Sequence, residues 1–436
     1  MISKIANIFK VKDLRKKIFF TLSLLVVFRL GGQVTLPGIQ NPDMSAAVGG
    51  LSILELYDQF VGNFLSQASI FSLGIMPYIS ASIIIQLMTA IVPYFQRLKK
   101  EGPEGNKKII QLTRYGTVFI AAVQAIGVAT LWSGQAVPFE QGGMGTGLFY
   151  SVTIISLVTG TIFVMWLGEQ ITDYGIGNGI SLIITVGILA GAPTAFSDFF
   201  GLMMQSSTQA VKGIVLFAIL IGIVTFTVLI TSALRKIPVQ FAKRVVGRKV
   251  YGGQASHIPL KILTAGVMPI IFAQALMFIP QLLGQFTEWS WLLNGFAPTA
   301  WAYNIVFAVL VIIFTYFYTA IAFNPADVAD NMQKQGGFIP GVRPGKATSD
   351  FIDNILTRVT LPASIALAFI AILPFIFQKY GNIDYSFAIF FGGTSIIIAV
   401  GVALDTMQQI EGHLVSRHYD GFLKTGRIKG RSKTRF

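Results

Sequence analysis

The sequence predicts an all-α polytopic membrane protein, and three observations predict it. The chain has 436 residues, of which 53% are hydrophobic and only 12% are charged, whereas about 25% of residues are charged in soluble globular proteins. Ten apolar stretches have the length of a bilayer-spanning helix, which needs about 20 residues. Nearly all lysines and arginines lie in alternate gaps between these stretches. The predicted fold therefore has ten transmembrane helices.

The first predicted span follows a basic N-terminal segment, residues 1–17. In it Ile2, Ile5, Phe9 and Leu14 are spaced to form a short amphipathic helix on the membrane surface. The apolar run that follows has no small-residue cleavage site, so we interpret it as a retained span and not as a secretory signal. The ten predicted spans are 18–36, 75–92, 115–135, 149–168, 180–196, 213–234, 262–286, 303–323, 359–377 and 386–404.

The distribution of basic residues predicts the orientation. All but three of the 33 lysines and arginines lie in the N-terminal segment, in alternate gaps, or in the tail, residues 411–436. The positive-inside rule places these segments and both termini in the cytoplasm. Ten spans divide into halves of five, residues 18–205 and 206–410. Because each half has an odd number of spans, the second half starts on the opposite side of the membrane from the first. The two halves are therefore predicted to be inverted around a central pore.

Several chemical functions are excluded by missing residues. The chain has no cysteine, and His257, His413 and His418 lie in basic gaps or the tail, so neither thiol chemistry nor a metal site is expected. Residues 341–347 lack the glycine and hydroxyl positions of a phosphate-binding loop, and the glycine-rich residues 175–179 join two spans. We therefore expect no enzyme and no cofactor.

Polar groups inside the spans are few. Arg29 lies in the first span, where its side chain either snorkels to an interface or has a role in the protein. This scarcity disfavours an ion-coupled transporter without excluding it. Gln86, Gln124 and Gln274 suit either interhelical hydrogen bonds or a seam that opens.

Residues 51–67 are too short and too polar to span a bilayer. They predict a half-helix on the outer side, with an apolar face that includes Leu54, Tyr57, Val61 and Phe64. Such an element lies at the membrane interface, or else it folds inward and lines a protein cavity.

Several segments together resemble the SecY family, the channel subunits of the Sec protein-conducting translocon, over essentially the whole chain. They are residues 68–86 (ASIFSLGIMPYISASIIIQ), 100–105 (KEGPEG), 166–181 (WLGEQITDYGIGNGIS), 242–251 (AKRVVGRKVY), 323–331 (FNPADVADN), 338–345 (FIPGVRPG) and 391–395 (FGGTS).

This resemblance implies a function for the features described above. Two five-helix halves would clamp an hourglass pore that unfolded polypeptides cross, with the half-helix 51–67 as a plug. A lateral gate would lie between spans two and three and spans seven and eight, with the three glutamines as its polar residues. The positions that match the family's pore ring are Ile79, Ile83, Ile184, Ile188, Ile271 and Ile398.

The resemblance also implies partners. The loops at residues 235–261 and 324–358 would dock the SecA motor ATPase or the ribosome, while basic loops also suit anionic lipids. SecE-like and SecG-like small membrane subunits, signal peptides and nascent chains are the other expected partners, in a bacterial plasma membrane. A small-solute transporter and a non-transporting scaffold are the alternatives. The expected docking residues are Lys236, Lys243, Arg244, Arg248, Lys249 and Arg343.

Overall fold

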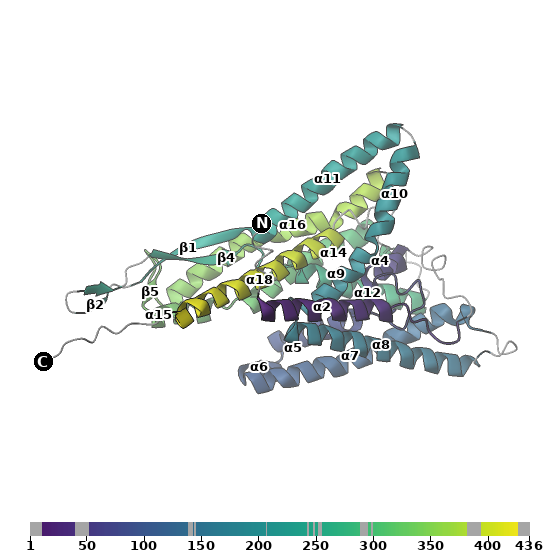
Figure 1. The fold of residues 1–436 in the computed structure, drawn as a ribbon, viewed down its shortest axis with the longest axis horizontal. Helices are drawn as coiled ribbons and strands as arrows, with labels where there is room; N and C mark the ends of the chain where they lie inside the picture. Colours follow the sequence, from purple (N-terminus) through teal and green to yellow (C-terminus); the bar gives the residue numbers. More distant parts are fainter. Residues whose placement is uncertain are drawn as a thin grey trace.

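The computed structural model describes residues 11–39, 52–137, 143, 145–205, 207–241, 244–246, 249–251, 255–287, 295–297, 300–381 and 394–425 (Figure 1). Its long helices run side by side in a bundle. The helices are α2 (Lys12–Gly31), α4 (Ser52–Val61), α5 (Met76–Ile91), α6 (Pro93–Lys100), α7 (Pro103–Trp132), α8 (Thr146–Tyr174), α9 (Gly179–Ala190), α10 (Ala192–Gln205), α11 (Ser207–Ser232), α12 (Met268–Thr287), α14 (Trp301–Ala322), α15 (Pro325–Lys334), α16 (Lys346–Gly381) and α18 (Thr394–Thr425).

Each of the ten predicted spans overlaps one of these helices, so the multi-pass helical fold class is confirmed. Within the described residues, six helical segments are long and apolar enough to cross a membrane, and the bent pair α5–α6 makes a seventh. The predicted first span extends beyond its helix, because α2 ends at Gly31 and not near residue 36. The predicted amphipathic segment lies largely outside the described residues, although Leu14 is buried in α2.

A proline explains the break between α5 and α6. The two helices meet at 94°, and Val92 between them has extended backbone angles (φ −91°, ψ 122°). The proline ring disfavours the helical region for the residue before it, and Pro93 itself is well suited to begin a helix. α6 therefore turns away from the spanning direction and carries Arg97, Lys99 and Lys100 in its last turn.

A small β-structure is present that the sequence did not predict. β1 (Leu234–Phe241) pairs antiparallel with β4 (Ala255–Lys261) and with β5 (Gly337–Phe338), and β2 (Arg244–Val246) pairs with β3 (Lys249–Tyr251). The loop expected at residues 235–261 is thus a long hairpin, and β5 joins it to the other expected loop. Ile237, Val239 and Leu260 bury one face of the sheet in a separate apolar cluster with α15 and α16.

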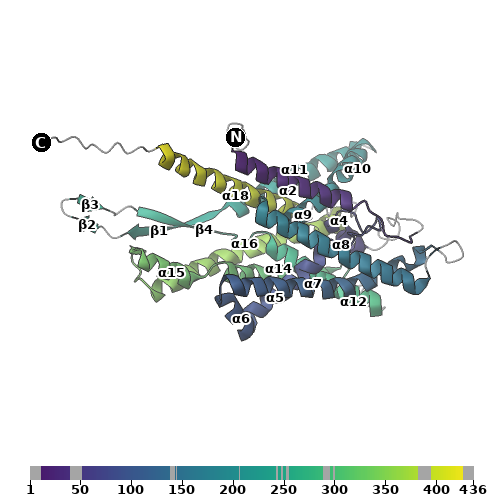
Figure 2. The same cartoon turned by 60° about the horizontal axis from the view of Figure 1, so that its bottom comes forward.

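The two ends of the molecule differ. Figures 1 and 2 both place the β1–β4 hairpin, α15 and the C-terminal end of α18 at one end, here called the sheet end. α4 and the tip of the α10–α11 hairpin lie toward the opposite end. Because the sheet end carries the basic loops, it corresponds to the side predicted to face the cytoplasm.

The turn between α8 and α9, within the first predicted half, contacts α18 of the second half. Asn178 caps α9, since its Oδ1 accepts hydrogen bonds from the N–H groups of Ile180 (3.1 Å) and Ser181 (3.2 Å). The N–H of Gly177, whose φ of +88° favours glycine, donates to Gln409 Oε1 on α18 at 3.0 Å. The glycine-rich residues 175–179 therefore form a tight structural turn.

Candidate functional site

All six isoleucines expected in the pore ring are buried in the same apolar core cluster. They come from elements far apart in the sequence, namely α5, α9, α12 and α18. Their exposed fractions are 4% or less. None of the six therefore points toward lipid, which is what a ring of pore-lining side chains requires.

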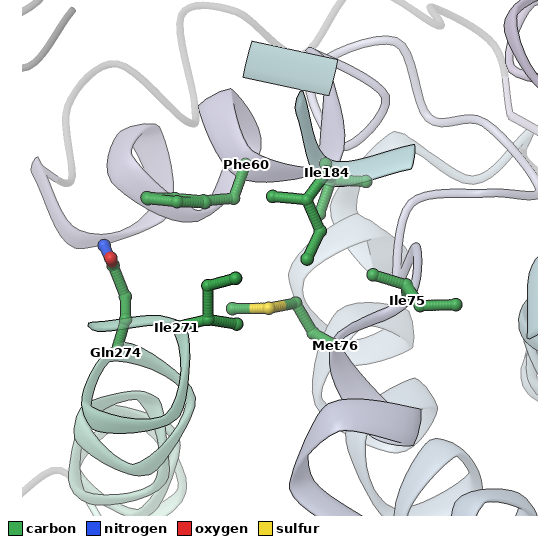
Figure 3. A pocket seen from close by; sticks show the side chains of 7 residues that line it. Phe60, Ile75, Met76, Ile184, Ile271 and Gln274 are labelled. Carbon is green, nitrogen blue, oxygen red and sulfur yellow. The ribbon is translucent and has the colours of Figure 1, made fainter. Parts of the chain in front are cut away.

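The ring region is closed in this structure. A narrow space of about 10 Å³ lies where α4, α5, α9 and α12 meet, which is at most the room that one water molecule needs. Figure 3 shows Ile184 and Ile271 approaching this space from α9 and α12, with Met76 of α5 between them. The space is also lined by Phe60 and Val61 of α4, by Ile75, and by Gln274 of α12. Two of the six expected ring residues, Ile184 and Ile271, thus lie directly on this space. We call this constriction the waist.

A wider polar cavity of about 420 Å³ lies between the two predicted halves, next to the end of β4. Asn178 and Ser181 line it from α9, and Lys261, Asp405 and Gln408 line it from the other half. Burial raises the pKa of the Asp405 carboxyl, while the nearby charge of Lys261 opposes that shift. The space between the two predicted halves is thus wider and more polar toward the sheet end than at the waist, as expected for one funnel of an hourglass-shaped pore.

The predicted plug segment folds inward. α4 is shorter than the predicted range 51–67, because Gly62 (φ +93°) and Asn63 (φ +64°) end the helix. The four apolar residues expected to form the plug are all buried, namely Leu54, Tyr57 and Val61 of α4 and Phe64 beyond it. The alternative of an interfacial helix is therefore wrong.

Polar contacts hold this segment in the protein. The Asp58 carboxylate accepts hydrogen bonds from the N–H groups of Leu65 (2.7 Å) and Ser66 (3.1 Å), and the Tyr57 hydroxyl donates to the Leu73 carbonyl at 2.9 Å. Burial, together with the charge of Asp58, raises the pKa of Tyr57. These contacts satisfy several polar groups of the segment within the protein, although the Oε1 atoms of Gln59 and Gln67 are buried without a hydrogen-bond partner among the described residues.

In the described part of the chain, no hydrogen bond joins the three expected gate glutamines. Gln124 on α7 and Gln274 on α12 are both 5% exposed, and their Oε1 atoms have no hydrogen-bond partner among the described residues. Gln86 is half-buried and donates to Ser82 on its own helix at 3.0 Å. α12 packs against both α5 and α7, so the expected seam exists as a packed interface.

Four of the six expected docking residues lie in the described part of the chain. Lys236 is exposed on β1 and Arg343 is exposed on the turn between β5 and α16. Arg244 and Lys249 lie at the ends of the small β2–β3 hairpin. Lys243 and Arg248 lie outside the described residues. Figure 1 places β2 and β5 together at the sheet end.

Several residues of the site were not predicted from sequence. Phe60, Ile75 and Met76 line the waist, and Asn178, Asp405 and Gln408 line the polar cavity. An apolar residue within an apolar helix carries no signal of its own in a single sequence. Asp405, by contrast, is an acidic residue directly after a predicted span, and its position could have suggested a polar cavity.

Comparisons with known proteins agree with this architecture. The SecY family profile matches residues 69–407. The protein translocase subunit SecY of Halalkalibacterium halodurans is 43% identical over 435 residues, which cover 97% of this chain and all of that protein. The corresponding subunit of Escherichia coli K12 is 40% identical, with 96% of each chain covered.

Solved structures show the same fold at lower identity. A structure described as a protein conducting channel has a TM-score of 0.67 at 20% identity and covers 95% of this chain and 94% of its own. Sec61 in the canine ribosome-channel complex from the endoplasmic reticulum has a TM-score of 0.63 at 19% identity, with 95% and 94% covered. With its buried waist, inward-folded α4 and full-length similarity to these relatives, the chain belongs to the SecY family.

Proposed function

We propose that the chain is a gated, passive channel through which unfolded polypeptides cross the bacterial plasma membrane or enter it sideways. The observation that carries this proposal is the arrangement along the bundle. A polar cavity and a closed apolar waist both lie between the two predicted halves, and α4 lines that waist. The similarity to protein translocase subunits supports the same function.

The chemistry of the waist suits a polypeptide better than an ion. Apolar side chains offer an ion nothing to replace its hydration, so a narrow ring of isoleucines resists ion flow. The same ring binds no particular side chain strongly, so varied sequences can slide through it. The ring residues are Ile79, Ile83, Ile184, Ile188, Ile271 and Ile398. α4 acts as the plug that closes the resting channel.

Lateral insertion uses the seam between α5–α7 and α12–α14. Gln124 and Gln274 are buried with carbonyl oxygens that have no partner among the described residues, which makes the closed seam less stable than an apolar one. An apolar signal helix entering the seam would replace these contacts by apolar burial. Gln86, which bonds within α5, has a lesser part.

The sheet end docks the partners that drive transport. The similar Sec61 structure is a ribosome complex. The hairpin that contains Lys236, Arg244 and Lys249 offers basic groups for the phosphates of ribosomal RNA, so ribosome binding would weaken as the salt concentration rises. Lys243 and Arg248 belong to the same loop. Arg343 is the residue we assign to SecA. SecE-like and SecG-like subunits bind the bundle, and both termini face the cytoplasm.

Reconstitution tests this function against the two alternatives. We expect vesicles that contain the chain and its co-purifying small subunits to import an unfolded precursor, protected from protease, when SecA and ATP are supplied. Saturable uptake of a small solute without precursor import would establish a secondary transporter instead. Secretion that continues unchanged after depletion of the chain would favour a scaffold.

A further inference from the structure

Arg29 is a cation on a membrane-spanning helix for which the channel pathway gives no role. It lies in the last turn of α2 and is half-buried. A charged side chain within a span is costly unless the protein gives it partners. In the described part of the chain, no carboxylate pairs with its guanidinium. Its partners must therefore be neutral groups.

Those partners belong to the end of the plug. Arg29 Nη1 donates to the carbonyl oxygen of Gly62 at 2.7 Å, a length typical of charge-assisted hydrogen bonds. The guanidinium carbon also lies 5.0 Å from the centre of the Phe64 ring, within cation–π range. Gly62 directly follows α4, so the cation also faces the partial negative charge of that helix end.

The chain beyond Asn63 is firmly attached to the bundle. Phe64 is fully buried and packs edge-on against Phe28 of α2, with ring centres 5.3 Å apart. Its carbonyl accepts hydrogen bonds from Ser69 N–H and from the Ser72 hydroxyl. Any movement of α4 must therefore turn about the residues that precede Phe64.

Gly62 and Asn63 have the properties of a hinge. Both have positive φ, and a Cβ added to Gly62 would lie 3.0 Å from Gly187 Cα and 3.1 Å from Arg29 Nη1. The carbonyl that Arg29 holds belongs to the peptide between these two residues. Rotation of that peptide changes the direction of α4 and breaks the hydrogen bond.

We propose that Arg29 is a positioning residue that locks the hinge of the plug at Gly62 and so sets the closed state of the channel. This inference rests on the proposed role of α4 as the plug. Opening requires the Gly62 carbonyl to leave the guanidinium. Loss of the guanidinium therefore raises the population of channels whose α4 is displaced, with no precursor present.

A cysteine reporter measures that population. The chain has no cysteine, so Leu54→Cys introduces a single thiol at a position of α4 that is 6% exposed. A membrane-impermeant thiol reagent, added from the outer side to the reconstituted full-length chain with its co-purifying subunits, labels it when α4 moves. We expect Arg29→Met to raise the labelling rate and the resting ion conductance about tenfold, which corresponds to loss of one charged hydrogen bond.

The comparison variants separate positioning from damage to the fold. Arg29→Met keeps an unbranched apolar stem and removes a charge from a span, so folding should be preserved. Arg29→Lys keeps a cationic donor and should give an intermediate rate. Arg15→Met changes an exposed arginine of the same helix and should match the parent. Parent-like labelling in Arg29→Met would overturn the proposal.

One further measurement distinguishes this proposal from the plug assignment itself. This measurement uses a channel whose one substitution is Leu54→Cys, with a precursor trapped inside it. The thiol should then be labelled faster than at rest, because the plug must leave the pathway that the precursor occupies. If it does not, the plug role is wrong whatever Arg29 does. If it does, and Arg29→Met still labels at the parent rate at rest, only the hinge-lock proposal fails.

Discussion

The ring of Tyr57 lies stacked on the ring of Phe278, with centroids 4.4 Å apart and planes inclined by 16°. Tyr57 belongs to α4 and Phe278 to α12, so this contact joins the proposed plug to a helix of the predicted lateral gate. α12 also packs against α5 and α7 across the seam. Displacement of the proposed plug and separation of the seam would therefore both break the contact between Tyr57 and Phe278. This common contact couples the two movements physically.

Tyr57→Ala should open the resting channel partially. An aromatic pair contributes about 0.5–1.5 kcal/mol beyond its buried area, so the conducting population should rise by up to about tenfold. Tyr57→Phe keeps the stack but removes the bond to Leu73, so its effect should be smaller. Ion conductance is measured for these variants, for Phe278→Ala and for the double variant Tyr57→Ala/Phe278→Ala. Together the two alanine variants and their combination form a double-mutant cycle. Additive effects would mean that the pair is not coupled.

Ile398→Asn should make the waist leak. Ile398 is fully buried on α18 in the cluster that surrounds the waist. An amide there gives water and ions a polar partner, and each 1.4 kcal/mol removed from the ion barrier raises conductance about tenfold. Resting conductance in planar bilayers measures this effect. Ile398→Leu keeps the apolar volume and should remain tight, whereas an equally tight Asn variant would contradict the ring assignment.

Gln274→Leu should stabilise the closed seam. The Gln274 Oε1 atom is buried without a partner in the described residues, and an unsatisfied buried acceptor costs about 1–3 kcal/mol. The leucine side chain has no polar atom to leave unsatisfied, so the substitution stabilises the closed seam relative to the open one. Precursors with weakly apolar signals should then be imported about fivefold more slowly. Gln86→Leu is the control, because Gln86 bonds to Ser82 and should change import little.

The helices of the bundle could be predicted from sequence because lipid imposes a simple rule. A span must be apolar over about 20 residues, so each predicted span overlaps a helix. The ends were less predictable, as at α2, because capping and packing decide them. The β1–β4 hairpin was missed for a different reason. Within Leu234–Phe241 only Ile237 and Val239 are buried, next to the charged pair Arg235 and Lys236, and so short an alternation does not identify a strand.

The candidate site was predictable only where a family pattern identified it. Ile184 and Ile271 do not differ in kind from the many other isoleucines of the spans, and three-dimensional packing selects them for the waist. Arg29 was visible as a charge in a span, but its partner is a backbone carbonyl at Gly62. A carbonyl group is present at every residue and leaves no trace in a sequence. The position of α4 inside the bundle was likewise undecided until packing was known.

Arg114→Ala should weaken the packing between α7 and α8. Arg114 donates to both carboxylate oxygens of Glu169, at 3.0 and 2.6 Å, and Glu169 is only 16% exposed. Arg114 is about half exposed, so solvent reduces the value of the pair to about 1 kcal/mol. Thermal unfolding in detergent should show this loss, and Glu169→Gln should then add little to it. Independent, additive losses would show that the pair is not coupled.

Arg343→Glu should impair SecA-driven import much more than it impairs folding. The turn that carries Arg343 is held by its backbone, since the Arg343 carbonyl accepts from the Thr348 hydroxyl at 2.8 Å and Val342 N–H donates to the Ile339 carbonyl at 3.1 Å. Gly341 and Gly345 have φ values of +83° and +96°, so the turn does not depend on the arginine side chain. That side chain is exposed and can contact a partner.

The matched variants decide what the partner recognises at this turn. Arg15→Glu reverses another exposed arginine, on α2 and outside both docking loops, and should leave import nearly unchanged. Arg343→Lys keeps the charge but loses the planar guanidinium, so import should fall only if the motor binds the arginine through two hydrogen bonds. Import of a precursor with SecA and ATP is the measurement, beside thermal unfolding of each variant. If Arg343→Glu imports the precursor as fast as the parent, the turn is not part of the docking surface. A contact that depends on the positive charge of Arg343 could not survive reversal of that charge.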